Sequence, residues 1–178
     1  MKQNPDIRRW ATLSRCRRYR YALRRQWRNG AWLGIIGLNP STADGQTDDP
    51  TIRRCISIAT ELGFGGLVML NVFALRSPDP RLLATATDPC GPGNRRALLR
   101  ESQRCRMLVA AWGNHCPAEH SLRIATLLNR DLYCFRRNKG GQPAHPLYLP
   151  QPVQPQLFFR AAGADCAPEI PAPAAASE

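Results

Sequence analysis

The 178-residue chain has few lysines and few acids. It holds 25 basic residues against 13 acidic ones, and only Lys2 and Lys139 are lysines. The net charge of +12 is therefore carried almost wholly by arginine, whose planar guanidinium binds phosphate through two parallel hydrogen bonds. We expect a nucleic acid as partner, DNA rather than RNA, or else a nucleotide. An arginine-rich coding bias would give the same composition.

Paired cysteines and long apolar segments are also lacking. The seven cysteines are an odd number with no Cys-x-x-Cys pair, which argues against a disulfide framework and a four-cysteine metal site. No apolar run approaches the ~20 residues that cross a membrane, and no apolar leader follows Met1. We expect a cytoplasmic monomer without a membrane partner. His115, Cys116 and His120 fit no common zinc spacing, so neither a metal nor another cofactor is expected.

Apolar patterns predict an α/β fold. Residues 18–24 alternate apolar and basic side chains, which predicts an edge strand with one solvent-exposed basic face. Asn29-Gly30 predicts a tight turn joining it, as an antiparallel hairpin, to the apolar run 31–38. Further strands are expected at 66–75, 107–112 and 132–135, and helices at 50–62, 93–106 and 118–129. Buried strands separated by helices predict a three-layer α/β/α sandwich with a mainly parallel sheet.

The chain is expected to form a single domain. A basic segment, 1–17, precedes the α/β/α domain of residues 18–160, and a Pro- and Ala-rich tail, 161–178, is expected to be disordered. Residues 157–159 (LFF) are the last segment expected to dock on the domain.

Polar residues follow the predicted strands at the sheet edge where ligands of such folds bind. Residues 39–44 (NPSTAD) follow one strand without the Gly-Lys-Ser/Thr ending of a phosphate loop. Asn71 interrupts another, where a buried carboxamide suits the hydrogen-bonding edge of a nucleobase or is satisfied by neighbouring main chain. His145 lies in a Pro-bounded loop, where a core role is less expected.

These segments, in this order, resemble the uracil-DNA glycosylase superfamily. The motifs are Gly37-Leu38-Asn39-Pro40, Leu70-Asn71-Val72 with Arg76, Leu108-Val109-Ala110-Ala111-Trp112-Gly113 and His145-Pro146. The first resembles the version of that superfamily's motif in which Asn replaces the catalytic Asp. Leu147 stands where the superfamily's His-Pro-Ser loop has Ser, and Leu149 holds the position of its inserted leucine.

The resemblance implies a fold like that of the superfamily and a role for each motif. Asn39 would position a water, and His145 would hydrogen-bond the departing base as negative charge develops. Asn71 would read the base edge, with Phe73 or Trp112 as a stacking face. Asp44 is a further candidate to activate water, because Asp48 or Asp49 is expected to cap a helix. The residues expected to contact phosphate or nucleic acid are Ser41, Thr42, Arg53, Arg54, Arg76 and Leu149.

The function implied is binding of nucleic acid with hydrolysis of the N-glycosidic bond of an unusual or modified base. Two alternatives stay open: a non-catalytic module that binds nucleic acid or a nucleotide, and an enzyme acting on free nucleotides. More closely, the strings LNPSTAD, DDPTIRRC, NVFALRSPDP, AAWG and HPLYL resemble a bacterial family, domain-of-unknown-function family 1643, over residues 18–150. That family supplies no activity.

Overall fold

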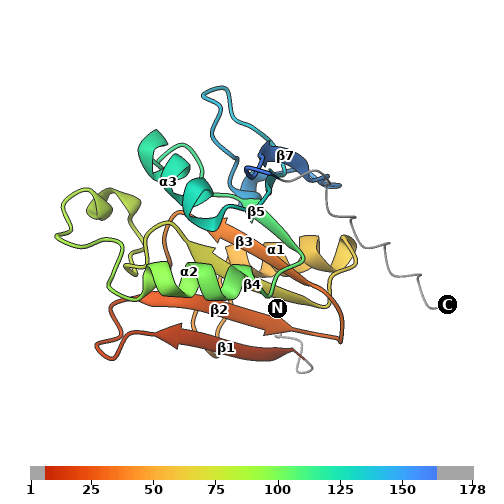
Figure 1. Cartoon of the computed structure of the whole chain (residues 1–178). Helices are drawn as coiled ribbons and strands as arrows, with labels where there is room; N and C mark the ends of the chain where they lie inside the picture. The colour runs from red at the N-terminus through yellow and green to blue at the C-terminus, as the bar shows by residue number, and fades with distance from the viewer. Residues whose placement is uncertain (1–6, 164–178) are drawn as a thin grey trace.

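Apolar runs of the sequence form the centre of a seven-stranded sheet (Figure 1) in a computed structural model that describes residues 7–163. The strands are β1 (Arg8–Leu13), β2 (Arg20–Gln26), β3 (Trp32–Gly37), β4 (Gly66–Asn71), β5 (Met107–Ala110), β6 (Leu132–Cys134) and β7 (Gln156–Phe159). The helices are α1 (Pro50–Glu61), α2 (Asn94–Ser102) and α3 (Ala118–Leu128), with 3-10 turns at Pro80–Leu83 and Pro146–Tyr148. The predicted α/β class is confirmed.

The sheet is parallel at its centre and antiparallel at both edges. Its strand order is β1-β2-β4-β3-β5-β6-β7. The four strands from β4 to β6 run parallel, whereas β1, β2 and β7 pair in the antiparallel sense. The prediction of a mainly parallel sheet therefore holds for the central strands only.

Helices cover both faces of the sheet. The sheet divides the core into two layers, and successive side chains of β4 point alternately into one layer and the other. Leu67 and Met69 pack with α1, whereas Val68 and Leu70 pack with α2 and α3. In Figure 1, α2 lies in front of β2 and β4, and α1 lies behind the sheet. This is the predicted three-layer arrangement, and it leaves the carboxyl ends of the parallel strands open at one edge. None of the helices within residues 7–163 is long and apolar enough to cross a membrane.

The predicted hairpin between residues 18–24 and 31–38 is wrong, because β4 lies between β2 and β3. Gly30 does take a positive φ of 146°. After this bend, however, β3 pairs with the far side of β4 and not with β2. At the bend itself the Trp27 N–H donates to Gly65 O, just before β4, at 3.1 Å. A turn dipeptide fixes where the chain bends but not which strand it meets, and the apolar run of β3 is buried only when flanked by two other strands.

β1 lies within the predicted basic segment 1–17 and forms the edge of the sheet, pairing with β2 from Arg8↔Gln26 onward. β2 is therefore an inner strand, not an edge strand. Of its predicted basic face, Arg18 is exposed and Arg24 is half-buried. Arg20 of that face, at 2% exposure, and Arg25 outside it, at 0%, are buried. A strand covered on both faces buries whichever side chains it carries, so these arginines need partners inside the protein.

Local signals in the sequence account for the other elements. Asp49 caps α1 by accepting a hydrogen bond from Ile52 N at 2.8 Å, with Pro50 as the first helical residue. Residues 157–159 lie in β7, which pairs with β6. Of the predicted tail, residues 164–178 lie outside the described residues.

Candidate functional site

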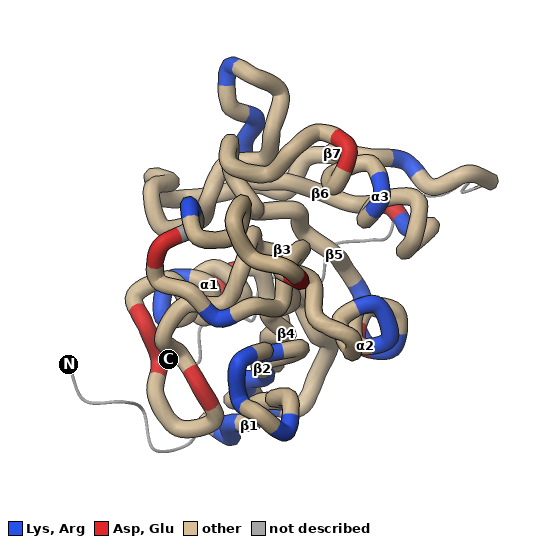
Figure 2. Tube along the Cα trace, turned by 90° about the vertical axis from the view of Figure 1, so that its left-hand side faces the viewer, with Lys and Arg blue, Asp and Glu red and all other residues tan. Residues whose placement is uncertain are grey.

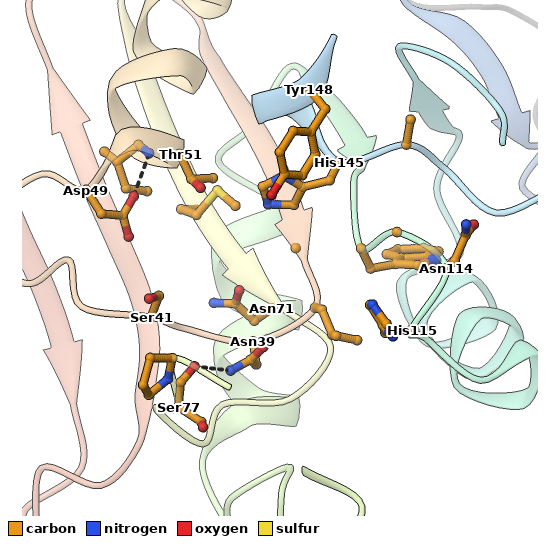
Figure 3. Close-up of a pocket in the computed structure, with 18 of the residues that line it drawn as sticks. Asn39, Ser41, Asp49, Thr51, Asn71, Ser77, Asn114, His115, His145 and Tyr148 are labelled. Atoms are coloured by element: carbon orange, nitrogen blue, oxygen red, sulfur yellow. Dashed lines mark hydrogen bonds between the residues drawn. The ribbon is translucent and has the colours of Figure 1, made fainter. Parts of the chain in front are cut away.

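A cavity of about 520 Å³ opens at the carboxyl ends of β3, β4 and β5. Asn39 follows β3 and Asn71 ends β4 (Figure 3), and Trp112 follows β5. The start of α1 and the loop around His145 close its other sides. Strand ends of a parallel sheet share one edge, so residues distant in the sequence meet here. Asn39, Ser41, Asn71 and His145, all predicted, line the same cavity.

Asn39 is held by main-chain carbonyls. Its Nδ2 donates to Ser77 O at 2.8 Å and to Pro40 O at 3.2 Å. These two bonds engage both amide hydrogens and fix the side chain on the cavity wall (Figure 3). The carbonyl Oδ1 remains as its acceptor, which is the atom able to orient a water molecule.

Asn71 carries an unpartnered polar atom. Asn71 is 1% exposed, and its side-chain Nδ2 has no hydrogen-bond partner within the described part of the chain. For this nitrogen, the alternative of satisfaction by neighbouring main chain is not what the structure shows. Gly37 pairs with Asn71 in the sheet, and a Cβ there would approach Asn71 Oδ1 to 3.2 Å. Glycine at position 37 therefore leaves room for the Asn71 carboxamide. Because leaving a buried amide without a hydrogen bond is costly, the unpaired Nδ2 is a reason to expect a ligand here.

His145 faces Asn71 from the opposite wall, next to Tyr148 (Figure 3). Its Nδ1 accepts a hydrogen bond from Leu147 N at 3.4 Å, which places the proton of a neutral ring on Nε2. Burial lowers the pKa of His145 below its ordinary 6.5, against a smaller opposing effect of the Asp49 charge. At neutral pH the ring is therefore an uncharged Nε2–H donor.

The lowered pKa predicts a pH-dependent stability. As the pH falls below about 6.5 the unfolded chain protonates His145 before the folded protein does, so the free energy of unfolding decreases with falling pH. We expect wild type to lose more stability between pH 7.5 and pH 5.5 than His145→Gln, measured by urea denaturation. Parallel losses in the two proteins would show that the histidine is not buried as described.

Asp44 does not line the cavity. Its Oδ1 accepts hydrogen bonds from Gln46 N and Thr47 N at 2.8 and 2.9 Å and closes its own loop, which also lowers its pKa. Among the described residues that line the cavity, Asp49 is the one carboxylate. It caps α1 as expected and also lines the site, a double role that the sequence analysis did not foresee.

Most residues predicted to contact phosphate or base lie outside the cavity lining. Arg53 bonds to Asp48 O, Arg54 to Leu149 O, and Arg76 to Arg17 O. The remaining three that do not line the cavity are Thr42, Phe73 and Leu149. Phe73 is buried against His120, and Leu149 is 6% exposed in the core beside α1. A leucine packed there is not available for insertion into DNA.

The loop instead exposes its middle residues. Leu147 is 36% exposed, and Tyr148 is 76% exposed at the cavity wall. Trp112 lines the cavity at 2% exposure and is fixed by a 2.9 Å bond from its Nε1 to Gln142 Oε1. The exposed aromatic face suited to stacking is therefore that of Tyr148.

Sequence reasoning missed several lining residues, of which Arg20 is the most unusual. It is a buried cation on β2, and it lines the cavity because β2 lies beside β4 in the sheet, an order that the sequence did not predict. Asn114, His115 and Arg136 also line the cavity. Within residues 7–163, no three His, Cys, Asp or Glu side chains are grouped as a metal site.

Comparisons with known proteins identify the family. The model of a family described as protein of unknown function, DUF1643, matches residues 20–147. Searches of the curated proteins and of the solved structures each found no match. The matched range runs from β2 through His145 and so includes Asn39 and Asn71. The chain therefore belongs to the DUF1643 family of proteins of unknown function.

Proposed function

We propose that this protein binds a nucleotide of a nucleic acid in the cavity and hydrolyses the N-glycosidic bond of an unusual or modified base. The observation that carries the proposal is Asn71, which lines the cavity together with Asn39 and His145 and whose buried Nδ2 has no partner within residues 7–163. A carboxamide offers one donor and one acceptor group, which is the pattern needed to read a base edge. The motif resemblance to uracil-DNA glycosylases suggests the same roles.

In the proposed reaction a water attacks C1′ of the sugar while the bond from C1′ to the base nitrogen breaks. The electron pair leaves with the base, so negative charge develops on it. Asn39 Oδ1 orients the water, and His145 Nε2–H donates a hydrogen bond to the base as the charge appears. Asp49, the one carboxylate among the described lining residues, accepts the proton that the water loses.

The surface charge supports a nucleic acid as the substrate. Lys and Arg lie along α2, at the β1–β2 end of the sheet and on the loop at the top of Figure 2. Arg95, Arg96 and Arg100 border a shallow groove on α2. Arginines spread over several elements suit contacts to a phosphate backbone, whose binding weakens steeply with salt.

The test is incubation of the protein with single- and double-stranded oligonucleotides carrying uracil, mismatched or modified bases. Alkali then cleaves any abasic site. We expect strand cleavage with at least one modified base and none with unmodified strands. An absence of cleavage from every strand would overturn the catalytic proposal.

The alternative is a binding module without catalysis. Asn39 lacks the basicity of a carboxylate, and Leu147 replaces the Ser of the glycosylase loop. On this alternative the oligonucleotides bind in a salt-sensitive way, with base preference, and stay intact. The cleavage assay and a binding titration on the same strands separate the two.

Replacing Asn71 tests the site under either proposal. Asn71→Leu has a similar volume but cannot hydrogen-bond, so we expect loss of base preference with unchanged non-specific binding. Because an unpaired buried amide disappears, we expect the free energy of unfolding to stay equal or to rise by about 1–3 kcal/mol. Oligonucleotide titrations and urea denaturation measure both. Thr42→Val, outside the cavity, is the control. Retained base preference in Asn71→Leu would remove Asn71 from the site.

A further inference from the structure

Arg20 brings an unneutralised charge to the cavity wall. It begins β2, where its main-chain N–H donates to Ala74 O at 2.9 Å, and its side chain lines the cavity. The residue is 2% exposed. Because β2 runs antiparallel to β4, the start of β2 lies beside the carboxyl end of β4, where Asn71 is found.

The guanidinium of Arg20 has few partners. Its Nη1 donates to Ala43 O at 2.6 Å, whereas its Nε has no partner among residues 7–163. No carboxylate of the described chain lies within ion-pair distance of it. Arg25, five residues further along the strand, is buried equally but meets Asp48 at 2.6 Å. Of the two buried arginines of β2, Arg25 is therefore neutralised by a carboxylate, whereas Arg20, which lines the cavity, is not paired with one among the described residues.

The surroundings of Arg20 disfavour its charge. Burial lowers its pKa to about 10, against the opposing charge of Asp49, while the charges of Arg76 and Arg25 lower it further and that of Asp44 raises it. The group is still protonated at neutral pH. Arg76, beside the lining residue Ser77, also has a buried Nε that finds no partner in the described part of the chain. A buried cation of this kind is stabilised by an anion that enters with a ligand.

Phosphate is the anion that these side chains fit. A guanidinium binds phosphate through two parallel hydrogen bonds, and the hydroxyls of Ser41 and Thr51 line the same cavity as further donors. The volume of about 520 Å³ lies within the range, roughly 300–1,000 Å³, of sites that enclose whole small ligands. A base at Asn71 therefore leaves room for more of its nucleotide.

We propose that Arg20 binds a phosphate group of the nucleotide whose base contacts Asn71, so that the cavity selects a nucleotide together with its phosphate. The inference rests on the proposed function, since it assumes a base at Asn71. It narrows the ligand to a nucleoside monophosphate, free or at the end of a strand, in preference to a nucleoside or base alone.

The test compares deoxynucleoside 5′-monophosphates with the matching deoxynucleosides by calorimetric titration of the full chain. We expect the preferred monophosphate to bind wild type at least tenfold more tightly than its nucleoside. Arg20→Met should reduce that ratio to below twofold without changing the affinity for the nucleoside. Arg81→Met removes an exposed arginine outside the cavity lining and should keep the full ratio.

Folding controls keep the test decisive. Arg20→Met removes an unneutralised charge, so its thermal midpoint should be no lower than that of wild type. Arg20→Lys keeps the charge but loses the two-bond geometry, and should show an intermediate ratio. Inorganic phosphate should raise the thermal midpoint of wild type and not that of Arg20→Met.

The outcomes separate this inference from the proposed function. An equal affinity of wild type for monophosphates and nucleosides, no binding of either, or an unchanged ratio in Arg20→Met would overturn the role of Arg20. Phosphate-dependent binding that Arg20→Met removes, but whose base preference stays unchanged in Asn71→Leu, supports Arg20 and contradicts the base site. Single strands with and without a terminal 5′-phosphate distinguish the sources: a preference for phosphorylated ends indicates a strand terminus, and monophosphates alone indicate a free nucleotide.

Discussion

Excision by His145→Ala is expected to be about 100- to 1,000-fold slower than by wild type, the range found when one donor to a developing anion is removed. The ring is a neutral Nε2–H donor, because Nδ1 accepts from Leu147 N and burial lowers its pKa. The donor acts on charge that appears only as the glycosidic bond breaks. The loss should therefore fall on the rate constant of excision and not on the dissociation constant of the strand.

Single-turnover excision assays measure this effect. His145→Gln retains an N–H donor and should recover part of the rate. His120→Ala, whose ring contacts Phe73 outside the cavity lining, is the control and should excise at the wild-type rate. If His145→Ala excised at the wild-type rate while remaining folded, the histidine would have no part in the chemistry.

Arg25→Met is expected to lower the free energy of unfolding by about 3–5 kcal/mol, because it breaks a buried ion pair and leaves a carboxylate without its main partner. Arg25 is 0% exposed, and its Nε donates to Asp48 Oδ1 at 2.6 Å. Its Nη2 donates to Asp44 O at 2.7 Å and Thr47 O at 3.3 Å. One side chain thus ties β2 to the loop that leads from Asn39 into α1.

Urea denaturation measures the loss. Arg81→Met is the matched control, since Arg81 is 87% exposed and pairs with the partly exposed Asp79, and its replacement should leave the free energy of unfolding nearly unchanged. A similar small change in Arg25→Met would show that solvent reaches the Arg25–Asp48 pair in solution.

Residue patterns were enough to predict the layers and the centre of the site. When apolar runs of strand length alternate with helical patterns, a sheet covered by helices is one of the few architectures that buries the apolar faces of both. Parallel strands share one carboxyl edge, so the positions of Asn39 and Asn71 at their ends predicted that these residues meet. Asp49-Pro50 likewise predicted the start of α1, because a cap depends only on residues next to it in the chain.

The order of the strands was decided by tertiary structure. Asn29-Gly30 bends the chain, yet β4, not β3, is the strand that pairs with β2, and β1 adds an edge that the predicted boundary at residue 17 did not contain. Pairing depends on which neighbours bury each apolar run, and that is a property of the whole sheet.

The contrast between local signals and whole-sheet pairing also separates the site residues that were predicted from those that were not. Motif positions pointed to His145, which lines the cavity, but Leu149, four residues later, lies in the core. Asp44 bonds its own loop, whereas Asp49 lines the cavity. The number of arginines determines the net charge of the protein, but their positions in the sequence did not predict which of them are buried. The sequence by itself determined the layers, the family motifs and the local caps, because these depend on residues close together in the chain. Burial of Arg20 and Arg25 was decided only by the tertiary structure, because burial depends on what segments distant in the sequence place around a side chain.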